Sequence, residues 1–212
     1  MNISQLPPRP DPHTGEPRPP EAPVDGRRRT GEQDKNGLNK IPSAPPGHGP
    51  VLEWFVPSRS SSWITALVIP VIGFALLTFW DTGFGWVKAW YLWAILLAPI
   101  PYMFWQDRGS RVSAGADWVS CFEGRYLRTY ELTKVKMSVG GTGRWLDLED
   151  AQGGALCINA AELQRNPKVW DLVYLGILYS VHEGGAETNK AETNKLARRH
   201  LQLDNPPFHR AY

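Results

Sequence analysis

Two long uncharged stretches in the first half of the chain constrain its folding most. Residues 60–80 carry no charged side chain over 21 positions, and 18 further uncharged residues run from Ala89 to Gln106. A helix of 21 residues is about 32 Å long, close to the ~30 Å apolar core of a bilayer. Neither stretch shows a helical or strand periodicity in hydropathy that would divide it into a polar and an apolar face. The pattern predicts transmembrane helices at 60–80 and 87–106, the alternative being two buried helices of a soluble domain.

The ends of these stretches carry tryptophan, and the link between them is short. Six of the ten tryptophans lie between Trp63 and Trp105, mostly near the ends of the stretches, where indole rings prefer the headgroup level. The link, residues 81–88, can only turn the chain back, which predicts a helical hairpin. Basic residues outside the hairpin outnumber Lys88 inside the link, so both termini are expected in the cytoplasm. We therefore expect a multi-pass protein of the cell membrane, with the lipid bilayer as a partner.

Residues 1–59 have the composition of a disordered tail. Twelve of the 19 prolines lie in the first 50 residues, and residues 1–59 hold eight basic and seven acidic side chains. Such a segment buries too little apolar surface to offset the entropy lost on ordering. P-x-x-P spacings occur at Pro7/Pro10, Pro17/Pro20, Pro20/Pro23 and Pro42/Pro45. They could dock in aromatic grooves as polyproline II helices, although proline-rich tails also produce such spacings by chance.

Residues 107–212 have the pattern of an α+β domain. Short alternating segments between glycine-containing turns predict an antiparallel meander with one buried face. Asn159, followed by Glu162, predicts a helix start, and Asn166-Pro167 predicts another. The second helix carries apolar residues at helical spacing from Trp170 to Val181 and is expected to end at Gly184-Gly185.

Three segments of this region carry a resemblance to a known family. They are Tyr130–Lys136 (Tyr-Glu-Leu-Thr-Lys-Val-Lys), Trp170–Tyr174 (Trp-Asp-Leu-Val-Tyr) and Gly176–Val181. They are similar to segments of an uncharacterised, membrane-anchored family of pleckstrin-homology-like (PH-like) proteins from high-GC Gram-positive bacteria. The resemblance covers roughly residues 60–203. It implies a cytoplasmic PH-like domain at 107–212, with a curved antiparallel sheet and a C-terminal helix, and it transfers no catalytic or lipid-binding residue.

The sequence contains no pattern of residues typical of a catalytic, cofactor-binding or metal-binding site. Cys121 and Cys157 fall on expected strands without a C-x-x-C partner and are expected to be buried. The five histidines lack zinc-ligand spacing. The chain is therefore expected not to be an enzyme and to need no cofactor. Its net charge of +2 argues against a nucleic-acid partner.

The best candidate for a binding site is a group of four basic residues. Arg125, Arg128, Lys134 and Lys136 lie on neighbouring expected strands and turns, where PH-like domains can hold lipid phosphates. Acidic residues are interleaved with them, so a mixed-charge surface is the alternative. These four residues are the predicted lipid- or anion-binding site.

The predicted function is that of a non-catalytic interaction or scaffold module that presents a PH-like domain at the inner membrane face to a protein partner. Two alternatives remain open from the residues. One is binding of phosphoinositide-like or other anionic lipid headgroups, and the other is a role as an accessory subunit of a membrane enzyme or transporter. Self-association into a homo-oligomer also stays open.

Overall fold

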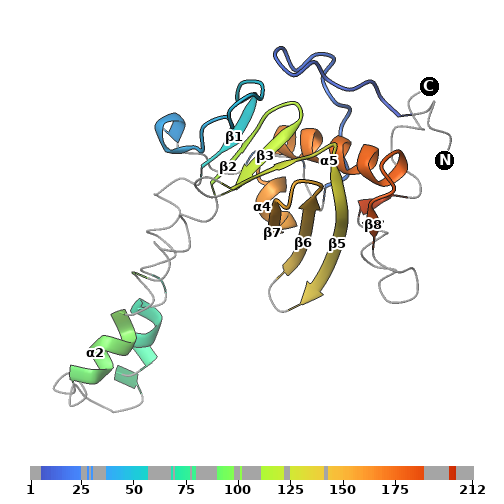
Figure 1. Cartoon of the computed structure of the whole chain (residues 1–212). Coiled ribbons are helices and arrows are strands. Elements are labelled where there is room, and N and C mark those ends of the chain that lie inside the picture. The colour runs from blue at the N-terminus through green and yellow to red at the C-terminus, as the bar shows by residue number, and fades with distance from the viewer. Residues whose placement is uncertain are drawn as a thin grey trace.

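Two four-stranded sheets and a helix of 16 residues make up the body of the molecule (Figure 1). The computed structural model describes residues 6–24, 28, 30, 37–56, 68, 70–76, 78–79, 90–97, 101, 111–121, 125–140, 143–188 and 201–203. The first sheet has the order β1-β2-β3-β4, and each neighbouring pair is antiparallel. Its strands are β1 (Glu53–Phe55), β2 (Val112–Ala114), β3 (Trp118–Cys121) and β4 (Tyr126–Arg128). A short 3-10 helix, η2 (Gly37–Lys40), precedes β1.

The second sheet has the order β7-β6-β5-β8. Its long hairpin pairs β5 (Leu132–Gly140) with β6 (Gly143–Asp150), and β7 (Ala155–Asn159) continues the meander. The short strand β8 (Glu187–Thr188) pairs with β5 in parallel. The α+β class and the antiparallel meander are therefore confirmed.

The two expected helix starts are also confirmed. Asn159 caps α4 (Ala160–Gln164) by accepting the N–H of Ala161 at 3.0 Å. Asn166 caps α5 (Pro167–His182) by accepting the N–H of Lys168 at 3.1 Å, with the proline in the first turn. A short polar side chain at such a position satisfies an amide that has no partner inside the helix.

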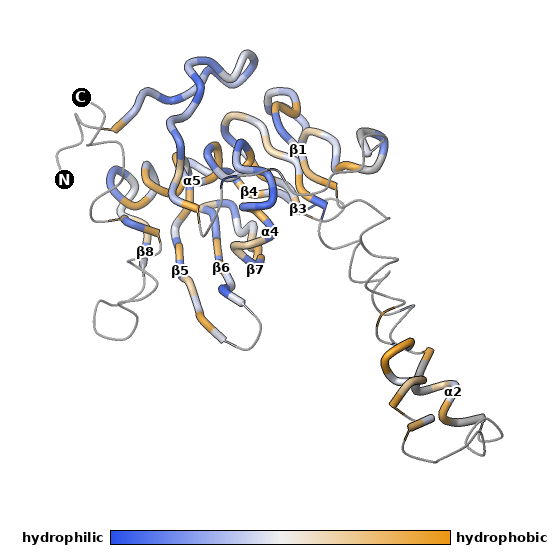
Figure 2. The backbone as a smooth tube through the Cα atoms, turned by 180° about the vertical axis from the view of Figure 1, so that it is seen from behind, coloured by the Kyte–Doolittle hydropathy of each residue, from blue (hydrophilic) through white to orange (hydrophobic). Residues whose placement is uncertain are grey.

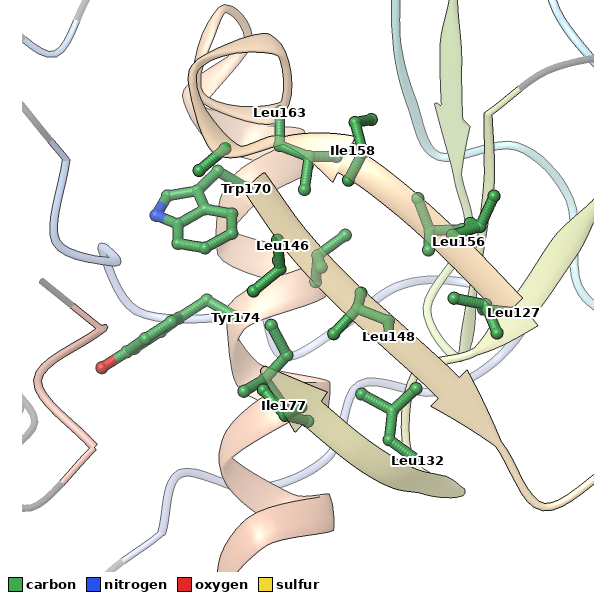
Figure 3. Packing of buried hydrophobic residues seen from close by; sticks show 14 of the residues in the cluster. Leu127, Leu132, Leu146, Leu148, Leu156, Ile158, Leu163, Trp170, Tyr174 and Ile177 are labelled. Atoms are coloured by element: carbon green, nitrogen blue, oxygen red, sulfur yellow. The ribbon is translucent and has the colours of Figure 1, made fainter. Parts of the chain in front are cut away.

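The main core lies between α5 and the second sheet. Figure 3 shows α5 crossing behind the strands, and the buried cluster joins Trp170, Tyr174 and Ile177 of the helix to Leu146 and Leu148 of β6. All five side chains are at most 1 % exposed. Residues 169–180 of α5 are all buried, because the helix packs on the sheets and the N-terminal segment covers it as well.

The expected transmembrane hairpin is contradicted. α2 (Trp90–Leu97) has eight residues and is thus about 12 Å long, against the ~30 Å core of a bilayer. No helix in the described part of the chain is long and apolar enough to cross a membrane. The predicted cell-membrane location, which depended on such spans, is corrected with it, and the bilayer partner stays a prediction. Parts of both predicted spans lie outside the described residues, including 60–67, 80, 87–89, 98–100 and 102–106.

The hydropathy that suggested the hairpin is nevertheless visible in the structure. Figure 2 colours α2 and the helical residues around 70–76 as a mostly apolar part of the chain, apart from the two sheets. Mean hydropathy measures how apolar a stretch is, whereas crossing a bilayer also requires about 20 consecutive helical residues.

The expected disorder of residues 1–59 is contradicted for those of them that the structure describes. Residues 51–56 include β1, which pairs with β2 and so makes the predicted tail part of the first sheet. Ala22 is 5 % exposed and belongs to the hydrophobic core. Figure 1 shows the described N-terminal residues, in blue, running over the molecule beside α5. The segment orders because it binds to the folded body, which composition does not reveal.

Candidate functional site

The four basic residues of the predicted anion site lie around β4 and β5. Arg125 precedes β4 and Arg128 ends it, whereas Lys134 and Lys136 share one face of β5 because they are two residues apart. Three of the four contact a carboxylate. The pairs are Arg128–Glu131 at 3.3 Å, Lys134–Glu149, and Lys136–Glu187 at 2.7 Å. Each pair offsets one positive charge, and anion binding by these residues stays a prediction.

Arg125 lines an open pocket of about 470 Å³, together with Tyr126, Asp150, Gln152 and the turn residues 153–155. The Asp150 carboxylate is already engaged, since it accepts the N–H groups of Gln152 at 3.0 Å and Gly154 at 2.7 Å. These bonds shape the β6–β7 turn, where Gly153 has a φ of +84° that favours glycine. Asp150 therefore has a structural role in this pocket.

The two cysteines differ in exposure. Cys121 is fully buried in β3, as expected, and burial raises the pKa of its thiol to about 12. Cys157 in β7 is exposed, which corrects the expectation that both are buried. A hydrogen bond with Asp147 raises the pKa of the Cys157 thiol to about 11, so little thiolate is available near neutral pH. In the described part of the chain, no three His, Cys, Asp or Glu side chains are grouped to hold a metal.

A larger polar feature is the surface that holds the N-terminal segment. Side-chain N–H and O–H groups of the body donate to main-chain carbonyls of residues 7–54. The bonds are Tyr179–Pro7 at 2.5 Å, Trp170–Pro23 at 2.7 Å, Ser113–Pro42 at 2.9 Å, Trp118–Gly49 at 3.1 Å and Asn166–Trp54 at 2.8 Å. We call Ser113, Trp118, Asn166, Trp170 and Tyr179 the carbonyl-binding surface.

This arrangement suits a proline-rich ligand. An extended proline-rich backbone makes no internal hydrogen bonds and leaves its carbonyls free. Three of the five accepting carbonyls belong to prolines, namely Pro7, Pro23 and Pro42. Each of these prolines is a member of a P-x-x-P spacing in the sequence. Prolines of these P-x-x-P spacings therefore bind to the folded body of the same chain.

Asp171 on α5 anchors the inner part of the N-terminal segment. Its carboxylate accepts the main-chain N–H of Ala22 at 2.8 Å and forms an ion pair with the guanidinium of Arg28. Only 9 % of the Asp171 side chain is exposed. Burial raises the pKa of Asp171, while the bonds to Arg28 and Ala22 act in the opposite direction. The anchor thus joins a buried acid to a backbone amide and a cation.

The outer part of the segment is held through Arg9. Its guanidinium lies 5.1 Å from the ring centroid of Tyr130 and 4.4 Å from that of Tyr179. The same group forms an ion pair with Glu183 at 2.5 Å. Aromatic faces and a carboxylate thus surround one arginine side chain just after the end of α5.

The two described N-terminal stretches also contact one another. A Cβ atom on Gly49 would lie 1.8 Å from the carbonyl oxygen of Pro12, so only glycine allows the chains to approach this closely. Next to this crossing, His48 is bonded to Asp117 at 2.9 Å. Residues 6–24 and 37–56 therefore form one docked layer.

The helical spacing of apolar residues from Trp170 to Val181 indicates only that the aromatic residues of α5 pack with other apolar side chains. Trp170 is indeed 1 % exposed, yet its indole nitrogen donates to Pro23. Figure 3 shows this nitrogen on the side of the ring away from the strands. The sequence held one signal for this contact, namely a proline-rich segment and amphipathic aromatic residues in the same chain. No local pattern, however, indicates that the segment and these aromatic residues are in contact.

The resemblance to PH-like proteins stays a prediction at this point. Comparisons with family models, with curated proteins and with solved structures found no match to this chain.

Proposed function

We propose that this chain is a non-catalytic protein-interaction module that binds extended, proline-rich segments of a partner protein. The observation that carries the proposal is the carbonyl-binding surface, whose five side chains hold the chain's own proline-rich backbone. Donors of the indole and hydroxyl type, set beside aromatic rings, are how protein modules take up polyproline segments. Each donor here meets a carbonyl at 2.5–3.1 Å.

The folded body supports the PH-like assignment that the resemblance implies. A four-stranded antiparallel sheet is followed by a three-stranded antiparallel meander and a C-terminal helix. Headgroup binding has less support, because Arg128, Lys134 and Lys136 are each paired with a carboxylate. A protein partner therefore remains the better supported ligand.

The test is binding of a proline-rich peptide in trans. A fluorescent peptide of residues 6–24 is titrated into the full chain carrying Arg9→Ala and Ala22→Asp, which weaken docking of the chain's own segment. We expect saturable binding to this variant, and binding at least about tenfold weaker to the wild-type chain, where the internal segment competes at ~mM effective concentration. Fluorescence anisotropy measures both affinities.

A matched peptide with alanine in place of every proline is the control. It should bind about tenfold more weakly, because it loses the extended conformation that proline sets in advance. Circular dichroism and thermal unfolding establish that the variant chain is folded. A folded variant that binds neither peptide contradicts the proposed function. A single Arg9→Ala chain, which leaves the core residue Ala22 in place, repeats the test if the double variant is unfolded.

A further inference from the structure

We infer that Tyr130, Tyr179 and Glu183 form an arginine-binding site for a proline-flanked arginine of a partner protein, and that Arg9 occupies this site within the chain. The inference rests on the proposed function and names the side chain that the partner contributes. We call these three residues the arginine site.

The geometry of the arginine site selects a guanidinium. The two tyrosine rings meet edge to face, with centroids 5.4 Å apart and an interplanar angle of 64°. The Arg9 guanidinium lies over both rings, and one of its nitrogens reaches Glu183 at 2.5 Å. A planar, weakly hydrated guanidinium can stack on a ring and bind a carboxylate at the same time. A lysine ammonium is compact and strongly hydrated, and it lacks the planar face for stacking.

The backbone next to the arginine is recognised as well. The hydroxyl of Tyr179 donates to the carbonyl of Pro7 at 2.5 Å, so one side chain reads both a carbonyl and the arginine two residues later. Pro8 and Pro10 flank Arg9 and favour an extended backbone on both sides of it. The ligand pattern that the arginine site fits is therefore Pro-x-Arg-Pro.

Residues 6–10, the outer part of the N-terminal segment, can detach from the body while the rest of the segment stays bound. Half of the Arg9 side chain is exposed, and Glu183 is 29 % exposed. By contrast, Ala22 is 5 % exposed in the core, and Asp171 is 9 % exposed where it pairs with Arg28. Opening residues 6–10 uncovers the partly buried Leu6 and the buried Pro10, whereas moving Ala22 withdraws a member of the core cluster itself. The inner anchor can thus keep the segment tethered while the arginine site exchanges its occupant.

Such a tether makes Arg9 an internal competitor. A segment held a short distance from its site has an effective concentration in the ~mM range. A partner segment of the same intrinsic affinity must be present above this concentration to displace Arg9 from the arginine site. The wild-type chain therefore favours its own Arg9 as the occupant. Removing the Arg9 side chain should therefore raise the affinity for an external ligand.

The experiment compares three peptides of residues 6–12, Leu-Pro-Pro-Arg-Pro-Asp-Pro, with Arg, Lys or Ala at the central position. Each is labelled and titrated into the full chain carrying Arg9→Ala. We expect the Arg peptide to bind about tenfold more tightly than the Lys peptide and the Ala peptide to bind weakest. Adding Glu183→Gln should weaken the Arg peptide about tenfold and the Ala peptide little. The control is Glu149→Gln, which removes a more exposed carboxylate on β6 that pairs with Lys134, and it should change neither affinity.

The outcomes separate the two proposals. Equal affinity of the Arg, Lys and Ala peptides overturns the arginine site but leaves binding of proline-rich segments intact. Loss of binding in Glu149→Gln to the same extent as in Glu183→Gln also overturns the site, because a general electrostatic attraction would then explain it. If peptide 6–24 binds the variant chain while no 6–12 peptide does, the arginine site is wrong and the proposed function stands.

Discussion

At the scale of single residues, two acids of the α5 region hold two arginines of the N-terminal segment in different environments. Asp171 is almost buried where it pairs with Arg28, whereas Glu183 and its partner Arg9 are partly exposed. A charged hydrogen bond gains strength as solvent is removed, and a buried charge becomes more costly once its partner is lost. Asp171 is therefore the residue on which docking of the inner segment depends most.

Replacing Asp171 by asparagine tests this dependence. The Asp171→Asn amide can still accept the N–H of Ala22 through its oxygen, but its NH2 group then faces the guanidinium of Arg28. Two donors cannot bond to each other, so the free energy of unfolding should fall by about 1–3 kcal/mol. Burial raises the pKa of Asp171 above its ordinary value of 3.8. Chemical denaturation of both proteins between about pH 4 and pH 7 measures the difference in stability.

The sign of the pH effect follows from the direction of the shift. The folded state takes up the Asp171 proton at a higher pH than the unfolded state, so the contribution of this group to stability falls as the pH rises through the folded pKa. The stability gap between wild type and Asp171→Asn should therefore widen as the pH is lowered. A gap that narrows would contradict this account. As a control, Glu21→Gln changes the other, largely exposed carboxylate near Arg28 and should have an effect below about 0.5 kcal/mol.

At the scale of secondary-structure elements, α5 was the most predictable part of the chain. The cap at Asn166, the proline after it and the two glycines at the end are all local signals, and the helix begins and ends where they indicate. The opposite holds for the uncharged stretches, where hydropathy alone predicted two membrane spans and the described helices are too short to form one. Local signals set helix ends well, but hydropathy does not report helix length.

One contact of α5 gives a prediction at this scale. A Cβ atom on Gly176 would lie 2.7 Å from the carbonyl oxygen and 2.4 Å from the Cβ of Thr129, in the β4–β5 connection. Gly176→Ala should therefore lower the free energy of unfolding by about 1–3 kcal/mol through overpacking, although alanine favours a helix by ~1 kcal/mol over glycine. Urea denaturation measures the change.

The matched control is Gly140→Ala at the end of β5, where an added Cβ would meet no atom within 4 Å. Its effect should stay within about 0.5 kcal/mol. If Gly176→Ala is as stable as the wild type or more stable, α5 does not need its close approach to the β4–β5 connection, and helix propensity dominates there.

At the scale of the whole molecule, the N-terminal segment is part of the folded body. β1 extends the first sheet, Ala22 enters the core, and the carbonyl-binding surface donates to five main-chain carbonyls of the segment. A segment with few apolar residues cannot order by burial of its own side chains. It orders here because preformed donors and a buried acid on the body satisfy its backbone and its cations.

Graded truncation tests this integration. Deleting residues 1–12 removes the partly exposed contacts of Pro7 and Arg9 together with the packing of Leu6 and Pro10, and should cost on the order of 1 kcal/mol. Deleting residues 1–30 also removes Ala22 and Arg28 and leaves Asp171 without its partners, so the loss should be on the order of 3 kcal/mol. Thermal and chemical unfolding of the three chains give the values. Two truncated chains as stable as the full chain would indicate a segment that contributes nothing to the fold.

Local patterns in the sequence were sufficient for the α+β class, the antiparallel meander and the limits of α5, because alternation, turn residues and helix caps act over a few residues. They also placed the four basic residues near β4 and β5, but not the carboxylates that pair with three of them. Tertiary structure alone decided the order of the N-terminal segment and the place of Arg9 between Tyr130, Tyr179 and Glu183. The contacts of Arg9 and Pro7 join residues more than 100 positions apart, and no short-range pattern encodes which distant surfaces satisfy one another's hydrogen bonds and charges.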